Sequence, residues 1–320
     1  MCEISFIIPN YTNDLKYVEA CYNALVSNNH LNEISEIIVI DNNSSSEIFN
    51  KITEIAAKYD NFHIVHLEEN KGTGYARNLG IKIAKGNYIY FVDNDDLIVP
   101  TTILKMLNHI KKYDLDLIFC NTADIINEKI MFSPFSLINF YNINSYKMNI
   151  NINEYSNLLW GWACWRFLLN KNFLINNNIQ FNNNSIAEDV FFTAKLYSKM
   201  KNIGVINDIG YLHRVGTGIS QNVHTESHFI ICVNAFEYVL KKYNLSHIVY
   251  YQILYNELIN GIFINEITVK EYKNIVCNVL ELVPKKVYDT LLPLFRELYS
   301  CVLNEDEQSF NNFKNILKKG

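Results

Sequence analysis

The stretch that decides the fold is residues 87–96, which read NYIYFVDNDD. Its first half is rich in aromatic and β-branched side chains, which is typical of a buried strand. Three carboxylates follow within four positions, at Asp93, Asp95 and Asp96. Carboxylates crowded together repel one another and are costly to remove from water, so the pattern favours a counter-charge such as a divalent cation. Because oxygen ligands suit hard metals, the stretch indicates Mg²⁺ or Mn²⁺ and a phosphate-bearing substrate.

Two other interpretations of this acidic stretch deserve comparison. It could be a polar turn that caps the helix expected from Pro100, but one acid would be enough for that. A calcium-binding loop fits poorly, because the next alternate position is Leu97 and the glycine that such a loop requires is missing.

The segments before and after this stretch alternate between two periodicities. Short apolar runs predict strands, and helical spacing between them predicts helices. The strands are expected at 4–9, 34–40, 62–67, 88–92 and 115–120, and the helices at 14–28, 46–59, 73–85 and 101–113. This order predicts an α/β fold with a mainly parallel, Rossmann-like sheet and helices on both faces.

Polar residues follow several of the predicted strands. They are Asn10 and Tyr11, the segment 41–44, and the acids of 93–96. Because ligands on parallel sheets bind at the carboxyl ends of the strands, we expect these residues to meet.

The rest of the chain divides into two parts. Residues 121–222 are irregular, with a helix expected from Ala187. Beyond 225 only helical spacing is found, including an apolar helix face in 247–263. We therefore expect a main domain at 1–222 and a helical C-terminal region at 223–320.

The bulk composition is that of an ordinary soluble protein. The chain has 320 residues, 49% of them hydrophobic, and a net charge of −5, which gives no electrostatic footprint for nucleic acid. Its seven cysteines stand singly, which suits a reducing cytoplasm. We expect neither a signal peptide nor a membrane-spanning helix, because the chain shows no basic leader and no apolar run of sufficient length.

Gly72-Thr73-Gly74-Tyr75-Ala76 superficially matches a dinucleotide-binding loop. We reject that interpretation, because Arg77 stands where the third small residue is needed and the loop follows the third strand. A helix start that lets Arg77 approach an anionic ligand or the acidic cluster is the better account.

Several further positions have open interpretations. Asp189 is either a complement to a helix dipole or a general base. The segment 211–214 could be a partly exposed edge strand. In it, His213 is either structural or a ligand, and Arg214 could clamp phosphate through its forked donors. The tryptophans of 160–165 either pack in the core or stack on a sugar ring.

Five segments, taken in order, resemble the family 2 inverting glycosyltransferases. They are 7–11 (IIPNY), 36–44 (EIIVIDNNS), 70–80 (NKGTGYARNLG), 84–89 (AKGNYI) and 93–96 (DNDD). Glu188-Asp189 and 211–214 extend the likeness to about residue 220. The resemblance implies a GT-A fold, with nucleotide-sugar binding in 1–120 and the acceptor side and base in 121–222.

The resemblance also implies the roles of individual residues. Asp189 would be the catalytic base, and Mn²⁺ or Mg²⁺ would be held by Asp93, Asp95 and His213. A UDP-sugar donor would be bound by Pro9, Tyr11, Asp41, Asn42, Arg77, Asp93, Asn94, Asp96 and Arg214. Many family members carry an aspartate where this chain has Asn42, which can still accept a hydrogen bond from uracil; thymine presents the same edge, so dTDP stays open beside UDP.

The implied reaction moves a hexose or N-acetylhexosamine from the UDP-sugar to a hydroxyl of a glycan or lipid-linked glycan acceptor, with inversion. Bacterial surface polysaccharide, capsule or lipo-oligosaccharide synthesis is the implied setting. The alternatives are a sugar nucleotidyltransferase, whose early glycine-rich loop is missing here, and a non-catalytic carbohydrate-binding scaffold.

Location and assembly are expectations of the same kind. The resemblance suggests a cytoplasmic protein at the inner face of the plasma membrane, where many enzymes of this family meet lipid-linked acceptors. We also expect a homodimer that forms through the C-terminal helices. Ten basic residues after 225 are offset by eleven acids, so electrostatic attraction to a membrane is expected to be weak.

Overall fold

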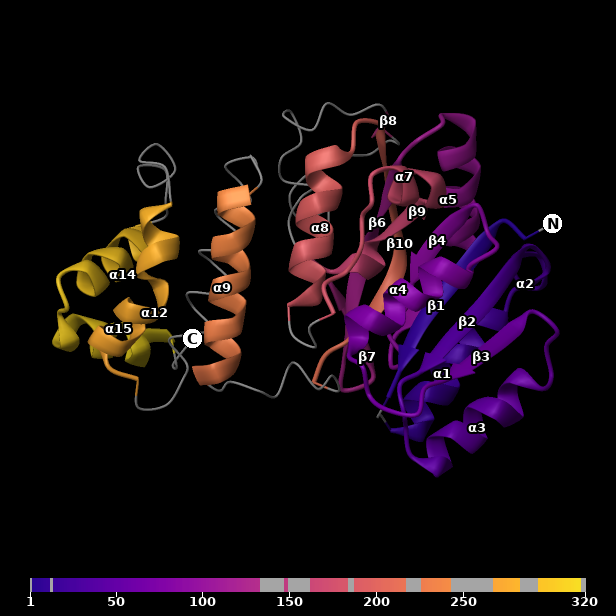
Figure 1. Ribbon diagram of the computed structural model, residues 1–320, viewed down its shortest axis with the longest axis horizontal. Coiled ribbons are helices and arrows are strands. Elements are labelled where there is room, and N and C mark those ends of the chain that lie inside the picture. The colour runs from indigo at the N-terminus through magenta and orange to yellow at the C-terminus, as the bar shows by residue number, and fades with distance from the viewer. Residues whose placement is uncertain are drawn as a thin grey trace. The chain divides into compact units, whose positions relative to one another are not determined.

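The computed structural model describes residues 2–11, 14–132, 147–148, 162–183, 187–216, 226–242, 267–282 and 293–317. The chain divides into two compact units, 1–158 with 162–221, and 159–161 with 222–320 (Figure 1). Each unit is described by itself. The predicted helix face in 247–263 lies outside the described residues.

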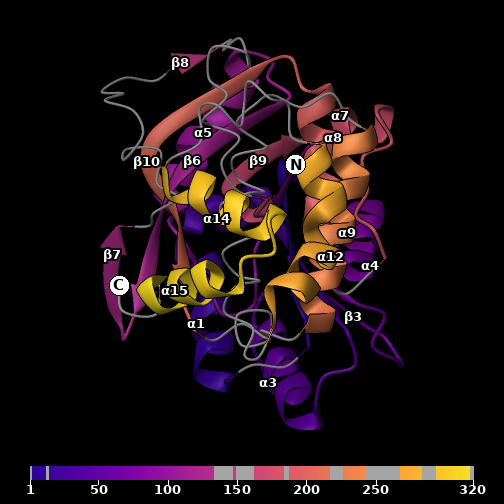
Figure 2. The ribbon, with the colours of Figure 1, turned by 90° about the vertical axis from the view of Figure 1, so that its left-hand side faces the viewer.

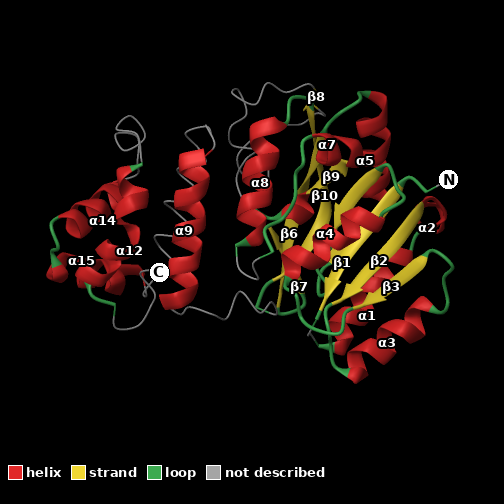
Figure 3. Cartoon of the chain, in the orientation of Figure 1, coloured by secondary structure: helices red, strands yellow, loops and turns green. Residues whose placement is uncertain are grey.

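The first unit is built on a ten-stranded sheet, drawn in yellow in Figure 3. Its order is β3-β2-β1-β4-β9-β6-β10-β5, with β7 beside β6 and β8 beside β10. The strands are β1 (Ile4–Asn10), β2 (Ser35–Asp41), β3 (Phe62–His66), β4 (Tyr88–Phe91), β5 (Leu97–Ile98), β6 (Leu117–Ile126), β7 (Lys129–Phe132), β8 (Lys147–Met148), β9 (Phe167–Asn170) and β10 (Ile203–Arg214).

The predicted parallel arrangement holds in two halves of this sheet. β1, β2, β3 and β4 pair in parallel, as do β6 and β10. Between the halves, β9 pairs antiparallel with both β4 and β6. This short strand, with its apolar run in 167–169, was not among the predicted strands.

Seven α-helices are described in this unit. They are α1 (Leu15–Val26), α2 (Asn29–Ile34), α3 (Ser46–Ala56), α4 (Thr73–Ile83), α5 (Pro100–Lys112), α7 (Lys171–Asn176) and α8 (Glu188–Lys199). Several of these helices begin at residues that favour a helix N-terminus. The side chains of Asp14 and Ser45 cap α1 and α3, and Pro100 is the first residue of α5. Gly72 precedes α4 with a φ of 85°, a conformation that glycine adopts readily.

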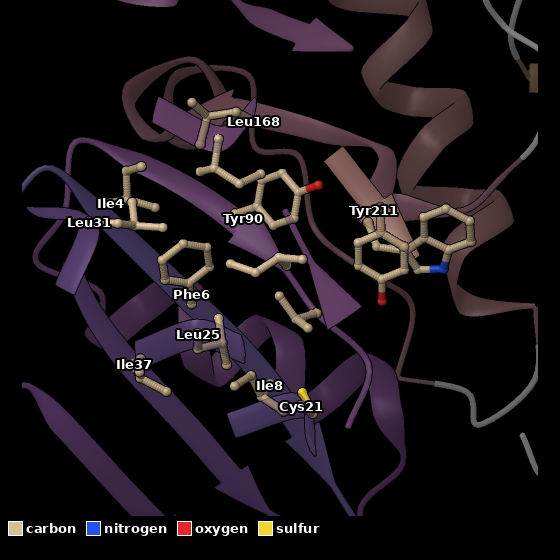
Figure 4. Close-up of a cluster of buried hydrophobic side chains, with 14 of the residues drawn as sticks. Ile4, Phe6, Ile8, Cys21, Leu25, Leu31, Ile37, Tyr90, Leu168 and Tyr211 are labelled. Carbon is tan, nitrogen blue, oxygen red and sulfur yellow. The ribbon is translucent and has the colours of Figure 1, made fainter. Parts of the chain in front are cut away.

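Helices cover both faces of the sheet, as predicted. On one face α1, α3 and α5 pack on a cluster that includes Phe6, Ile8, Tyr90 and Tyr211, shown in Figure 4. On the other face Phe91 packs edge-on against Phe181 and against Phe192 of α8. The apolar side chains packed on the two faces hold the strands, and with them their carboxyl ends, in fixed positions.

Two predictions about strands are corrected by the structure. β6 extends to Ile126, six residues beyond the predicted end, because its pairing with β10 continues. The segment Tyr211–Arg214, expected as a partly exposed edge strand, is the end of β10, which pairs with β6 on one side and β5 on the other.

The second unit is helical in its described part, as Figure 2 shows. It contains α9 (Glu226–Lys242), α12 (Val269–Glu281), α14 (Pro293–Leu303) and α15 (Glu307–Leu317). Tyr272 of α12 packs its ring against Phe229 of α9 and Phe310 of α15. None of the helices in the described ranges is both long and apolar enough to cross a membrane.

A buried carboxylate ties β1, β2 and the start of β4 together. Glu36 Oε1 accepts hydrogen bonds from the Ser5 hydroxyl at 2.6 Å, the Lys85 amide at 2.5 Å and the Gly86 amide at 3.2 Å. A Cβ on Gly86 would lie 2.6 Å from the Ser5 amide nitrogen, so the backbone passes where a side chain would stand.

We expect Gly86→Ala to lower the free energy of unfolding by about 1–3 kcal/mol, because the methyl group forces β1 and β4 apart. Urea denaturation followed by circular dichroism measures this. The control is Lys85→Ala, which removes an exposed side chain and keeps the amide, and is expected to change stability by less than about 0.5 kcal/mol. Equal stability of the two variants would contradict the close approach at Gly86.

Candidate functional site

The polar residues that follow β1, β2 and β4 lie together, as the parallel order predicts. Asn94 Nδ2 donates to Asn10 Oδ1 at 2.8 Å, and Asn10 Nδ2 donates to Asp41 Oδ1 at 2.8 Å. All three side chains are buried. One chain of hydrogen bonds therefore crosses three strand ends and fixes their relative positions.

Asp41 lies at the centre of this chain and is completely buried. The Ser44 hydroxyl donates to its Oδ1 at 2.5 Å, and Nδ1 of His66 lies 2.7 Å from its Oδ2. His66, at the end of β3, was not among the predicted site residues. It brings a fourth strand end to the same edge of the sheet.

Asn42 orders the loop that leads into α4. Its Oδ1 accepts from the Lys71 amide at 2.8 Å, and its Nδ2 donates to Asn70 Oδ1 at 2.7 Å. Asn70 Oδ1 also accepts from the Gly72 amide at 2.9 Å. The amide side chain thus supplies both a donor and an acceptor to this loop, which a second aspartate could not do.

The third acid of the cluster, Asp96, is 1% exposed and is held by the end of β10. Its Oδ2 accepts from the Tyr211 hydroxyl at 2.7 Å, and its Oδ1 accepts from the Arg214 amide at 2.6 Å. The Tyr211 hydroxyl also accepts from the Asp93 amide at 3.0 Å. Burial, reinforced by the charge of Asp95, raises the pKa of Asp96 well above its usual range.

Arg77 joins the acidic cluster to the start of α8. Its Nη2 donates to Asp93 Oδ1 and its Nη1 donates to Glu188 Oε1, each at 2.7 Å. Arg77 is 5% exposed, so these charge-assisted bonds are largely shielded from water. Asp93 and Glu188, which lie 95 residues apart in sequence, are therefore held by one guanidinium.

Asp189 follows Glu188 in the first turn of α8. The residue before them, Ala187, has a φ of 57°, which is uncommon for a side chain larger than glycine and marks a constrained turn. Burial, with the neighbouring charge of Glu188, raises the pKa of Asp189 to about 8. A carboxylate of that basicity is suited to accepting a proton near neutral pH.

His213 faces Asp124 and packs on an aromatic ring. Its Nδ1 lies 3.5 Å from Asp124 Oδ1, and its ring stacks on Trp165 with centroids 5.3 Å apart. Burial lowers its pKa, but the hydrogen bond to Asp124 and the nearby acids outweigh burial and raise it. Trp165 also stacks on Tyr211 at 4.4 Å.

Arg214 is 6% exposed and makes several contacts. Its Nε donates to the Asp95 carbonyl at 3.1 Å, and its Nη1 lies 3.2 Å from both carboxylate oxygens of Glu128. Its guanidinium also lies over the ring of Tyr17 at 4.1 Å. Arg214 is therefore both a clamp on the acidic loop and a cation at the edge of the sheet.

The remaining predicted positions lie at the same edge. Pro9 is half-buried in β1, Tyr11 is 40% exposed just beyond it, and Asp95 is buried. Within the described ranges, no group of three or more His, Cys, Asp or Glu side chains has the geometry of a metal site.

The residues that sequence reasoning missed act on the predicted ones. Tyr211 and Glu188 stood inside the quoted motifs without an assigned role, and Glu128 and His66 had no signal of their own. Each is separated from its partner by 25 to 118 residues, so no local pattern could have paired them.

The sequence of this chain matches a known protein family. Residues 5–182 match the family model described as Glycosyl transferase family 2. The poly(ribitol-phosphate) beta-glucosyltransferase of Bacillus spizizenii is 29% identical over 214 residues, which is 67% of this chain and 32% of that protein. The minor teichoic acid biosynthesis protein GgaB of Bacillus subtilis is 27% identical over 217 residues, 67% of this chain and 23% of its own length. The chain thus spans a third or less of these two relatives.

Solved structures show the same fold. S. aureus TarS 1-349 has a TM-score of 0.75 and 20% identity, covering 99% of this chain and 92% of that one. Its complex with UDP-GlcNAc has a TM-score of 0.77 and 19% identity, with the same coverage. The predicted GT-A type fold is confirmed by this likeness.

We expect Tyr211→Phe to lower the free energy of unfolding by about 1–3 kcal/mol, because it leaves buried Asp96 without one of its donors. The matched control is Tyr22→Phe. The Tyr22 hydroxyl is buried and has no hydrogen-bond partner in the described part of the chain, so its removal is expected to be neutral or stabilising. Chemical denaturation of both variants tests this, and an equal loss in both would refute the role of Tyr211.

Proposed function

The chain belongs to glycosyl transferase family 2, and we propose that it transfers a hexose or N-acetylhexosamine from a UDP-sugar to a hydroxyl group of a glycan acceptor, with inversion at the anomeric carbon. The observation that carries the proposal is the pair of ion pairs made by Arg77. They hold Asp93 of the acidic loop and Glu188, the neighbour of Asp189, which supports a single site for the proposed metal ligand and the proposed base.

The donor is proposed to bind over the linked ends of β1, β2 and β4. The nucleoside would be bound by Pro9, Tyr11, Asp41 and Asn42. The buried Asp41 would hold this part of the site in place through its contacts with Asn10 and His66. Asn94, Asp96, Arg77 and Arg214 would order the loop that meets the diphosphate and sugar. TarS has been solved with UDP and with UDP-GlcNAc, which supports a UDP-sugar as the donor class.

Asp189 is proposed to take the proton from the attacking acceptor hydroxyl. As that oxygen bonds to the anomeric carbon, the bond from this carbon to the diphosphate oxygen breaks and UDP leaves with the electron pair. Attack from the face opposite UDP converts an α-linked donor into a β-linked product. The raised pKa of Asp189 makes the carboxylate a stronger base than an exposed aspartate.

A divalent cation, Mn²⁺ or Mg²⁺, is proposed to be held by Asp93 and Asp95, with His213 as a further candidate ligand. When bound, it would neutralise the charge that develops on the leaving diphosphate. Arg77 positions Asp93, and Arg214 fixes the backbone at Asp95 through its carbonyl. These residues set the loop before the substrate arrives, which lowers the cost of organising the site.

The acceptor is proposed to be a bacterial surface glycan or a lipid-linked glycan. The names of two relatives refer to poly(ribitol-phosphate) and to teichoic acid, which supports a polymer that carries phosphate groups. The protein is proposed to work at the cytoplasmic face of the plasma membrane, as is common in the family. It is also proposed to dimerise through its C-terminal helices.

We expect Asp189→Asn to reduce transfer by about 100-fold or more while leaving donor affinity nearly unchanged, because the variant loses the base and keeps the fold. In the native protein, kcat/KM should rise with pH through about 8, where Asp189 loses its proton. Because the raised pKa means that the charged form is destabilised by folding, the Asn variant should also be at least as stable near pH 7.

Donor titration by calorimetry and transfer assays from pH 6 to 9 measure these effects. Asp208→Asn, at an exposed acid paired with Lys105, is the control for lost charge and should transfer normally. Near-normal turnover of the Asp189 variant would exclude this residue as the base.

We expect removal of divalent cations with a chelator to abolish transfer, and added Mn²⁺ to restore it. Asp95→Asn should raise the Mn²⁺ concentration needed for half-maximal rate by 10-fold or more, since a neutral amide is a weaker ligand than a carboxylate. Full turnover after exhaustive chelation would contradict the metal-dependent proposal.

A further inference from the structure

The guanidinium of Arg166 is buried and forms no ion pair within the described part of the chain. The residue is 1% exposed, and none of its three side-chain nitrogens has a hydrogen-bond partner in the described ranges. Burying an unpaired charge costs several kcal/mol, and buried polar groups in proteins almost always have partners. Burial accordingly lowers the pKa of Arg166. The arrangement indicates an anion that completes the site.

Arg166 lies in the short segment that leads into β9. It ends the short helix η2 (Cys164–Arg166) and directly precedes β9. The Cys120 thiol of β6 donates to its carbonyl at 3.6 Å, and the next residue, Phe167, pairs with Phe119. Arg166 is therefore beside Cys120, near the middle of β6, and later residues of that strand pair with His213 and Arg214.

Its two neighbours in η2 connect Arg166 to the reacting groups. Trp165 stacks on Tyr211, which holds Asp96, and Cys164 lies in the electrostatic field of Arg77, Asp93 and Asp189. The segment therefore lies between the acidic loop and the start of α8. Asp189, the proposed base for the acceptor hydroxyl, lies in the first turn of α8, so this segment is close to the residue that would meet the acceptor.

A hydroxyl group accompanies the guanidinium. Burial raises the pKa of Tyr197 to about 12, so its hydroxyl stays protonated, and it lies within the electrostatic field of Arg166. A forked cation near a neutral hydroxyl suits a phosphate or a carboxylate.

We propose that Arg166 binds a negatively charged group of the acceptor, a phosphate or a carboxylate, and thereby selects anionic over neutral acceptors. The inference rests on the proposed transfer reaction and adds a recognition residue to it. Because the guanidinium has no exposed atom in this state, the anion replaces packed side chains. A desolvated charge of this kind discriminates strongly against a ligand that leaves it unpaired.

The test compares Arg166→Met with the native protein and with Lys105→Met, which removes an exposed cation of α5. Thermal unfolding is followed with saturating UDP and Mn²⁺, which occupy the donor site, while glycerol phosphate or glucuronate is added. The native protein and Lys105→Met should gain stability with one of the two probes, and Arg166→Met should lose that gain. The phosphate and glucuronate arms identify which anion is recognised.

A second measurement separates recognition from a purely structural role. Without ligand, Arg166→Met should unfold at the same or a higher temperature, because it removes an unpaired buried charge. Transfer to an anionic acceptor should show a KM at least 10-fold higher, with a smaller change for a neutral acceptor.

The proposal would be overturned by any of three results: an equal probe response in Arg166→Met, no response of the native protein to either probe, or a clearly lower unfolding temperature of the variant without ligand. Absence of stabilisation by UDP would instead count against the proposed function, and the two failures are therefore distinguishable.

Discussion

The structure depends on keeping several carboxylates close together at the carboxyl edge of a buried sheet. Asp93, Asp95, Asp96 and Glu188 repel one another and lose solvation on folding, so each needs a fixed partner. Arg77 supplies two charge-assisted bonds, and the end of β10 supplies donors to Asp96 through Tyr211 and the Arg214 amide. The partners that offset the repulsion and the lost solvation of these carboxylates also fix their orientation.

The sheet topology follows from this requirement. β10 pairs in parallel with β6 and antiparallel with β5, and this brings Tyr211 level with Ile98, directly behind the acidic loop. The antiparallel strand β9 pairs with both β4 and β6, and Trp165 and Arg166 directly precede it. The ring of Trp165 stacks on Tyr211 and on His213, which joins this segment to the end of β10.

The first four strands and their helices could be predicted because their periodicity is local: β1 to β4 and α1 to α5 fall where apolar runs and cap residues place them, apart from the short α2. The convergence of Asn10, Asp41 and Asn94 followed from the rule for parallel strands. β9 was missed because a three-residue apolar run resembles any buried segment. The predicted end of β6 came too early because the polar residues at the true end of the strand are paired within the sheet.

The sequence by itself determined the α/β class, the carboxyl-edge position of the acids and the resemblance to a family, since these depend on residue types and spacing along the chain. Only the tertiary structure decided which charge neutralises which. The Arg77 guanidinium bonds Glu188 across 111 residues, the Arg214 guanidinium bonds Glu128 across 86, and the Arg166 guanidinium has no hydrogen-bond partner in the described ranges. Electrostatic energy depends on distance in space and on burial, and neither can be read from the order of residues in a single chain.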